Sequence, residues 1–323
     1  MSDTFICTYA LNGDGSGSAL SEETLHAGGI TDKPTWLHLS ARSESARQWL
    51  ETNAALPDTS IINALLAEDT RPRMVRRDEG ALLILRGVNL NDQASPEDMV
   101  SIRVWVEARR FISVQLRTLK GVTEMQTLLE SGAGPSDIGD LLTRFIEGSI
   151  NRLSPVIESL SDDIDDLEDM VLKLDKSDLR DQVISVRRQI TIFNRFLTPQ
   201  REIVHRVAET HFDWLTETHR QRLHEAQNEI TRFVEDLQAF RERANSVQDE
   251  IANILTERLN RNTYALSIIA AIFLPLGFLT GLLGINVPGI PGADDPEAFL
   301  IFCGLLVTVV VIQIALFKKL RWF

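Results

Sequence analysis

The sequence predicts an α+β membrane protein: an N-terminal α/β cytoplasmic domain, coiled-coil helices, and one very long stalk helix that continues into the first of two C-terminal transmembrane helices. Three observations predict this fold class. β-rich runs alternate with helical stretches in the first part of the chain, apolar residues then recur in heptads, and two long charge-free runs follow. The corresponding regions are residues 1–135, 136–261 and 262–323.

Residues 1–135 have the pattern of a mixed α/β domain. Runs rich in β-branched and aromatic residues predict strands, and segments with apolar residues every three or four positions predict helices between them. The expected strands are residues 4–11, 34–40, 81–88, 100–107 and 111–116, and the expected helices are residues 43–53, 59–68 and 122–131.

Residues 136–261 carry three apolar seams with the spacing of a coiled coil. They run from Ile146 to Leu174, from Leu179 to Val207 and from Ala226 to Ile254, mostly in steps of three and four. Pro199 is expected to kink the second helix. Because no Pro or Gly occurs between Trp214 and Leu274, the third helix is expected to continue into the membrane.

One stretch of the first coiled-coil helix is strongly acidic. A solvated helix face and a cation-attracting wall near a pore mouth both fit this charge, and the sequence leaves the two open. The acids are Glu158, Asp162, Asp163, Asp165, Asp166, Glu168 and Asp169.

Two charge-free runs are long enough to cross a bilayer, for which a helix needs about 20 apolar residues. The spans are expected at residues 263–285 and 298–317. Basic residues flank them at Arg258, Arg261, Lys318, Lys319 and Arg321, whereas the loop between them has no Lys or Arg and three acids. The positive-inside rule therefore puts both termini in the cytoplasm and a short loop in the periplasm, as in a multi-pass protein of the inner (plasma) membrane.

Composition excludes several classes of protein. With 33 Lys and Arg against 46 Asp and Glu, the net charge of −13 argues against a nucleic-acid partner, which needs a basic face. The two cysteines, Cys7 and Cys303, form neither a metal-ligand pair nor a disulfide framework. No catalytic motif occurs, so we expect neither an enzyme nor a bound cofactor.

The first span carries a stripe of mostly small or hydroxylated residues and no ionisable side chain. Such a face is expected at close helix contacts or along a water-filled channel, and the sequence leaves both open. Two helices do not enclose a pore alone, so a channel requires a homo-oligomer. The stripe comprises Asn260, Thr263, Ser267, Ala270, Leu274, Gly277 and Gly281.

The stripe leads to the tripeptide Gly284-Ile285-Asn286 at the outer membrane surface. A ring of Asn286 amides from several copies fits a hydrated divalent cation, because such ions lose water reluctantly. A plain turn explains Asn and Gly equally well from the backbone alone. The acids Asp294, Asp295 and Glu297 would raise the local cation concentration.

Histidine is a preferred zinc ligand, and four histidines lie close together at His205, His211, His219 and His224. Their spacings place no two of them at i and i+4 on one helical face. Ordinary solvated histidines fit this pattern, and so does a weak cytoplasmic zinc site at a subunit interface that uses His219 and His224. The sequence leaves both interpretations open.

The C-terminal region resembles the CorA family of divalent-cation transporters. The similarity rests on the two spans, the Gly-Xaa-Asn tripeptide, the basic aromatic tail and the run from Asn260 to Asn286. Ile285 and the following Val-Pro-Gly-Ile-Pro-Gly segment are similar to the ZntB branch, as are three segments of the soluble domain, although Pro288 stands where that branch has Gly. These segments are residues 71–73, 85–91 and 98–103.

The resemblance implies a homopentamer with a cytoplasmic funnel and a pore lined by the first span. It makes Gly284, Ile285 and Asn286 an outer selectivity ring and Asn260 a polar pore position at the cytoplasmic end. The branch implies zinc as the transported ion, with cadmium and nickel as further substrates. Two alternatives remain: a magnesium or cobalt channel of the same architecture, and a membrane-anchored scaffold without a pore. The direction of transport and its coupling to protons also stay open.

Overall fold

The computed structural model describes residues 4–28, 30–173, 179–284 and 295–319. The chain forms two compact units, Met1–Gln248 and Asp249–Phe323. The strands are β1 Phe5–Leu11, β2 Gly17–Ala19, β3 Thr35–Ser40, β4 Arg73–Arg77, β5 Gly80–Gly87, β6 Val100–Glu107 and β7 Arg110–Gln115. The helices are α1 Glu22–His26, α2 Glu44–Thr52, α3 Thr59–Leu66, α4 Lys120–Ser131, α5 Ile138–Asn151, α6 Ser154–Lys173, α7 Leu179–Glu209, α8 Glu217–Leu283 and α9 Ala298–Lys319.

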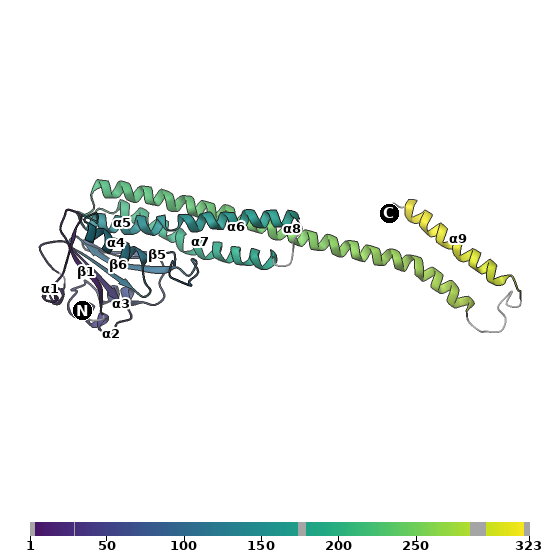
Figure 1. The fold of residues 1–323 in the computed structure, drawn as a ribbon, viewed down its shortest axis with the longest axis horizontal. Coiled ribbons are helices and arrows are strands. Elements are labelled where there is room, and N and C mark those ends of the chain that lie inside the picture. The colour runs from purple at the N-terminus through teal and green to yellow at the C-terminus, as the bar shows by residue number, and fades with distance from the viewer. Residues whose placement is uncertain (1–3, 29, 174–178, 285–294, 320–323) are drawn as a thin grey trace. The chain divides into compact units, whose positions relative to one another are not determined.

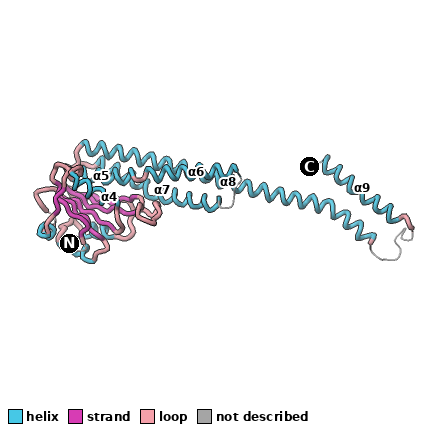
Figure 2. The backbone as a smooth tube through the Cα atoms, in the orientation of Figure 1, coloured by secondary structure: helices cyan, strands magenta, loops and turns pink. Residues whose placement is uncertain are grey.

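The strands of the first unit, coloured magenta in Figure 2, form one sheet. It has seven strands in the order β2-β1-β3-β7-β6-β5-β4. All neighbouring strands are antiparallel except β3 and β7, which pair in parallel with Trp36 opposite Phe111. The five expected strands are all present. β2 and β4 were missed, because β2 has only three residues and β4 is an edge strand rich in arginine.

Helices cover both faces of this sheet (Figure 1). On one face, Leu37 and Leu39 belong to a buried cluster that includes residues of α2 and α3. On the other face, the rings of Trp36 and Phe111 lie 5.5 and 5.2 Å from the ring of Phe145 on α5. Because side chains alternate along a strand, a strand buried on both faces is apolar at nearly every position.

The heptad seams are the buried faces of α5 to α8. Every described residue of the first two seams is buried, and the third is buried from Ala226 to Val247. The first seam is divided between α5 and α6, which begins at Ser154, so that Pro155 falls in the first turn of the new helix. α7 continues through Pro199, and α8 continues past Leu274 into the apolar region, as the uninterrupted sequence predicts.

Part of the acidic stretch on α6 is paired with a neighbouring helix. Arg243 of α8 donates from Nε to Glu168 at 2.8 Å and also forms an ion pair with Asp165. Burial, followed by the charges of Asp166 and Asp162, raises the pKa of Asp163. The stretch therefore combines paired acids with a crowded group of like charges.

A second arginine joins α8 to α5. Arg222 Nη1 donates to Asp140 at 2.7 Å and Nε donates to Glu147 at 2.9 Å, while Arg144 Nε donates to Asp140 at 3.0 Å. Burial disfavours the charged form of Asp140, but the hydrogen bonds and charges of Arg222 and Arg144 outweigh it and hold its pKa below the ordinary value. This cluster holds the beginning of α8 against α5 within the first unit.

The substitution Asp140→Asn is expected to lower the stability of the first unit by about 1.5–3 kcal/mol, the usual range for hydrogen bonds to charged groups. Folding lowers the pKa of Asp140, so the loss of stability in the variant is complete above the ordinary aspartate pKa. It becomes smaller as the pH falls through the lowered pKa, because Asp140 itself is then protonated. Thermal unfolding of the purified full-length chain measures it. Glu51→Gln is the control, because it removes an exposed i,i+4 ion pair with Arg47. We expect it to lower the stability by about 0.5 kcal/mol at most. Equal losses of stability in the two variants would contradict the role of Asp140.

Candidate functional site: the exposed face of the first apolar helix

Among the described residues, α8 and α9 each contain a stretch long and apolar enough to cross a membrane. In the most apolar 18-residue window of each helix, none of the residues is buried within the chain. Large side chains are openly exposed there, with Leu274 at 71% and Phe299 at 74%. An apolar surface of this extent requires lipid or another copy of the chain to cover it.

One face of the α8 span is turned toward α9. Gln313 of α9 donates from Nε2 to the carbonyl oxygen of Ala271 at 3.2 Å. A groove between the two helices is lined by four residues from each. The partly buried residues of the α8 span lie together on one side of the helix, next to the groove, and Leu276 belongs to both sets. They are Ile268, Ala271, Ile272, Leu276 and Leu279.

The predicted stripe lies on the opposite side of α8. At about 100° per residue, its seven positions occupy an arc of about 100°, centred well away from the face that α9 covers. All seven are exposed in the single chain: Asn260, Thr263, Ser267, Ala270, Leu274, Gly277 and Gly281. Gly277 is at the edge of this arc, since it also borders the groove with α9.

The chemistry of the stripe suits contact with water. Ser267 Oγ donates to the carbonyl oxygen of Thr263 at 2.8 Å, so its lone pairs remain available to accept from water. A Cβ added at Gly281 would meet no heavy atom within 4 Å. The stripe is therefore an uncovered, weakly polar surface along a helix that is long and apolar enough to cross a membrane.

At the end of α8, Gly284 is required by the backbone. Its N–H donates to the carbonyl oxygen of Thr280 at 2.9 Å, and an added Cβ would lie 2.8 Å from that same oxygen. Ile285, Asn286 and Asp294 lie outside the described residues, so the selectivity ring stays a prediction.

The two described acids after this segment are exposed and stand at the start of α9. The carboxylate of Asp295 accepts from the N–H of Glu297 at 2.9 Å. The carbonyl oxygens of Asp295 and Glu297 accept from Ala298 and Ile301. Asp295 thus has a structural role in the turn that precedes α9, and its exposed carboxylate can also attract cations.

The structure gives His219 and His224 different surroundings. His219 is buried at 7% exposure, its Nδ1 accepts from the N–H of Thr216 at 3.3 Å, and a Cβ on Gly139 would collide with its ring. His224 instead lies 3.3 Å from Glu209, measured from Nε2 to Oε1. His219 therefore serves the packing at the start of α8.

Two features of the structure were not predicted. The spacings between the histidines predict no pair on one helical face, whereas His205 and Glu209 have the i,i+4 spacing that places two ligands on one face. Gln313, the amide in the second span that contacts α8, is the second feature. Both signals are visible in the sequence.

Comparison with known proteins adds a family to this geometry. The family model described as CorA-like Mg2+ transporter protein matches residues 31–319. The chain is 36% identical to the zinc transport protein ZntB of Pectobacterium carotovorum over 98% of its length and 95% of the relative. It is 38% identical to the divalent cation transporter CmaX of Pseudomonas aeruginosa over 98% of its length and 96% of the relative.

A solved structure of similar sequence supports the same assignment. The structure of the full-length CmaX protein superposes with a TM-score of 0.84 at 37% identity and covers 99% of this chain and 98% of that chain. The likeness therefore includes the soluble unit, the long helix α8 and the apolar helix α9. The chain belongs to the CorA-like family of Mg2+ transporter proteins.

Proposed function

We propose that the chain transports divalent cations, with zinc as the principal substrate and cadmium and nickel as further ones, through a central pore of a homopentamer in the inner membrane. The observation that carries the proposal is the exposed stripe on α8, which faces away from α9. Two spans do not enclose a path, so another copy has to cover this face. Membership of a cation-transporter family makes an ion path the natural use of that surface.

The choice of zinc is supported by the relatives. ZntB is named as a zinc transporter and CmaX as a divalent cation transporter, and both match nearly the whole chain. In the proposed mechanism, Gly284, Ile285 and Asn286 form the outer selectivity ring. Hydrated cations would then pass along the stripe between this ring and Asn260, in either direction. Asn260 would lie at the cytoplasmic end of the span, on the side of the membrane where both chain termini are expected.

A magnesium or cobalt channel is the second candidate, because the description of the matching family names Mg2+. Both candidates use the same path and differ in the ion. A scaffold without a pore would need neither an uncovered stripe in its span nor an amide ring.

Uptake by liposomes that contain the purified full-length chain tests the transport function itself. Zinc and magnesium are added outside in separate experiments, and ion-sensitive dyes inside report their entry. We expect entry well above that of protein-free liposomes for zinc at least. No uptake of either ion, from protein shown to be folded and inserted, would contradict the proposal and favour a scaffold.

A further inference from the structure

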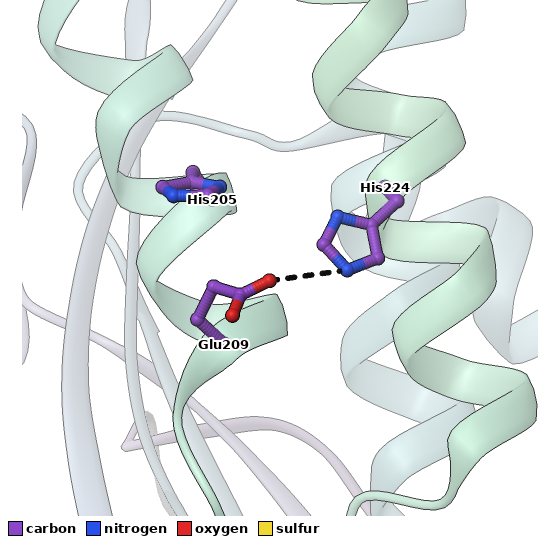
Figure 3. Close-up of side chains that lie close together, drawn as sticks. All are labelled: His205, Glu209 and His224. Carbon is purple, nitrogen blue, oxygen red and sulfur yellow. Dashed lines mark ion pairs between the residues drawn. The ribbon is translucent and has the colours of Figure 1, made fainter.

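Three potential metal ligands meet between α7 and α8 in the soluble unit. His205 and Glu209 lie on successive turns near the end of α7, and His224 faces them from α8 (Figure 3). One ligand atom from each residue lies within 4.8 Å of the other two. The group is separate from the exposed stripe and from the predicted selectivity ring.

The two imidazoles are oriented by one amide. Gln227 Oε1 lies 3.1 Å from Nδ1 of His205 and 3.4 Å from Nδ1 of His224. A carbonyl oxygen only accepts, so both Nδ1 atoms carry a proton, and in each neutral ring the lone pair is on Nε2. Histidines that bind metals are generally fixed in this way by a hydrogen bond from the other ring nitrogen.

The lone pair of His224 is directed toward the third member of the group. Its Nε2 lies 3.3 Å from Glu209 Oε1. Ligand atoms about 2.0–2.2 Å from a tetrahedral zinc ion are about 3.3–3.5 Å apart, so this pair already has the right separation. His205 and Glu209 are exposed and His224 is partly buried, which gives His205 room to close and leaves an approach from water.

We propose that His205, Glu209 and His224 bind a zinc ion between α7 and α8, with a water molecule as fourth ligand and Gln227 as the residue that orients both histidines. Two imidazoles and one carboxylate are a common ligand set for zinc. Magnesium prefers an octahedron of oxygen atoms and would not bind here. The site depends on neither the pore nor the selectivity ring.

The ordinary alternative is a surface ion pair between His224 and Glu209. The chain offers a matched example, because His211 Nε2 lies 3.6 Å from Asp213 on the surface, and the described residues place no further metal ligand beside that pair. An ion pair alone would need no second histidine and no shared amide. His211→Gln is therefore the control variant.

Cobalt is the probe, because bound Co2+ of low coordination number absorbs visible light and hydrated Co2+ does so weakly. The full-length chain in detergent is titrated with Co2+, and then with Zn2+ or Mg2+ as competitor. We expect absorption bands that Zn2+ abolishes and Mg2+ leaves unchanged. His224→Gln and Glu209→Gln should each weaken cobalt binding at least tenfold, whereas His211→Gln should leave it unchanged.

Gln227→Leu tests the orienting amide, and we expect a 10- to 100-fold loss of affinity, as for other residues that position metal ligands. Absent bands, or bands of equal strength in the wild type and in His224→Gln, would overturn the site. This experiment measures absorption and not uptake. The proposed zinc site can therefore be disproved even if the chain transports ions, and it can be supported even if no transport is observed.

Discussion

Replacing Asn286 by alanine is expected to lower the initial rate of zinc uptake into liposomes by at least about tenfold. In the proposed ring, each copy loses one amide that bonds to the water shell of the ion, and each such bond is worth about 1 kcal/mol. Because the loss is repeated in every copy around the pore, the effect multiplies. The rate is measured with a zinc-sensitive dye at equal amounts of inserted protein.

Asn286→Gly separates the amide ring from a plain turn. Glycine satisfies the backbone of a turn at least as well as asparagine, but it has no amide to offer an ion. We expect Asn286→Gly to be as slow as Asn286→Ala. Uptake at the wild-type rate in the glycine variant would mean that Asn286 serves the turn alone.

A lysine in the stripe is expected to reduce divalent-cation uptake at least about 100-fold. Thr263 is exposed near the beginning of the apolar part of α8, on the face that α9 leaves uncovered. At a separation of about 5 Å and an effective dielectric constant near 20, a positive charge opposes a divalent ion by several kcal/mol. Ser267 bonds to the backbone oxygen of Thr263, so Thr263→Lys keeps that hydrogen bond.

Ala265→Lys is the matched control, because it introduces the same charge at nearly the same depth. Ala265 is exposed and lies about 160° around the helix from Thr263. Both lysines are near enough to the end of the span to extend their charges toward water. Uptake should fall in Thr263→Lys and stay within about twofold of the wild type in Ala265→Lys. Equal effects would show that the stripe does not line the path.

Much of this fold could be predicted from the sequence because its patterns are long. The charge-free runs, the heptads and the uninterrupted stretch before Leu274 each persist over many residues, and the structure confirms the sheet domain, the buried seams and the continuous helix α8. Short features were not predicted. The helix is interrupted between α5 and α6, but the heptad spacing of apolar residues continues across the break, and only Pro155 marks it in the sequence.

The candidate site could be predicted only in part, because its ambiguity concerns contacts between elements. Small residues along Asn260 to Gly281 fit both a helix interface and a channel. Because α9 leaves that face uncovered, the small residues do not serve contact with α9. The face is free to line a channel or to contact another copy of the chain. His205 and His224 lie on different helices, and only the pairing of α7 with α8 brings them together with Glu209.

The most direct test of zinc as the substrate is the ratio of zinc uptake to magnesium uptake by the full-length chain in one preparation of liposomes. Both ions are supplied at equal activity, with the membrane potential and the pH gradient set to zero, and each is followed with its own dye. We expect zinc to enter faster than magnesium, and both rates to fall together in Thr263→Lys. Rapid magnesium uptake without zinc uptake would contradict the assignment and identify the chain as a magnesium channel.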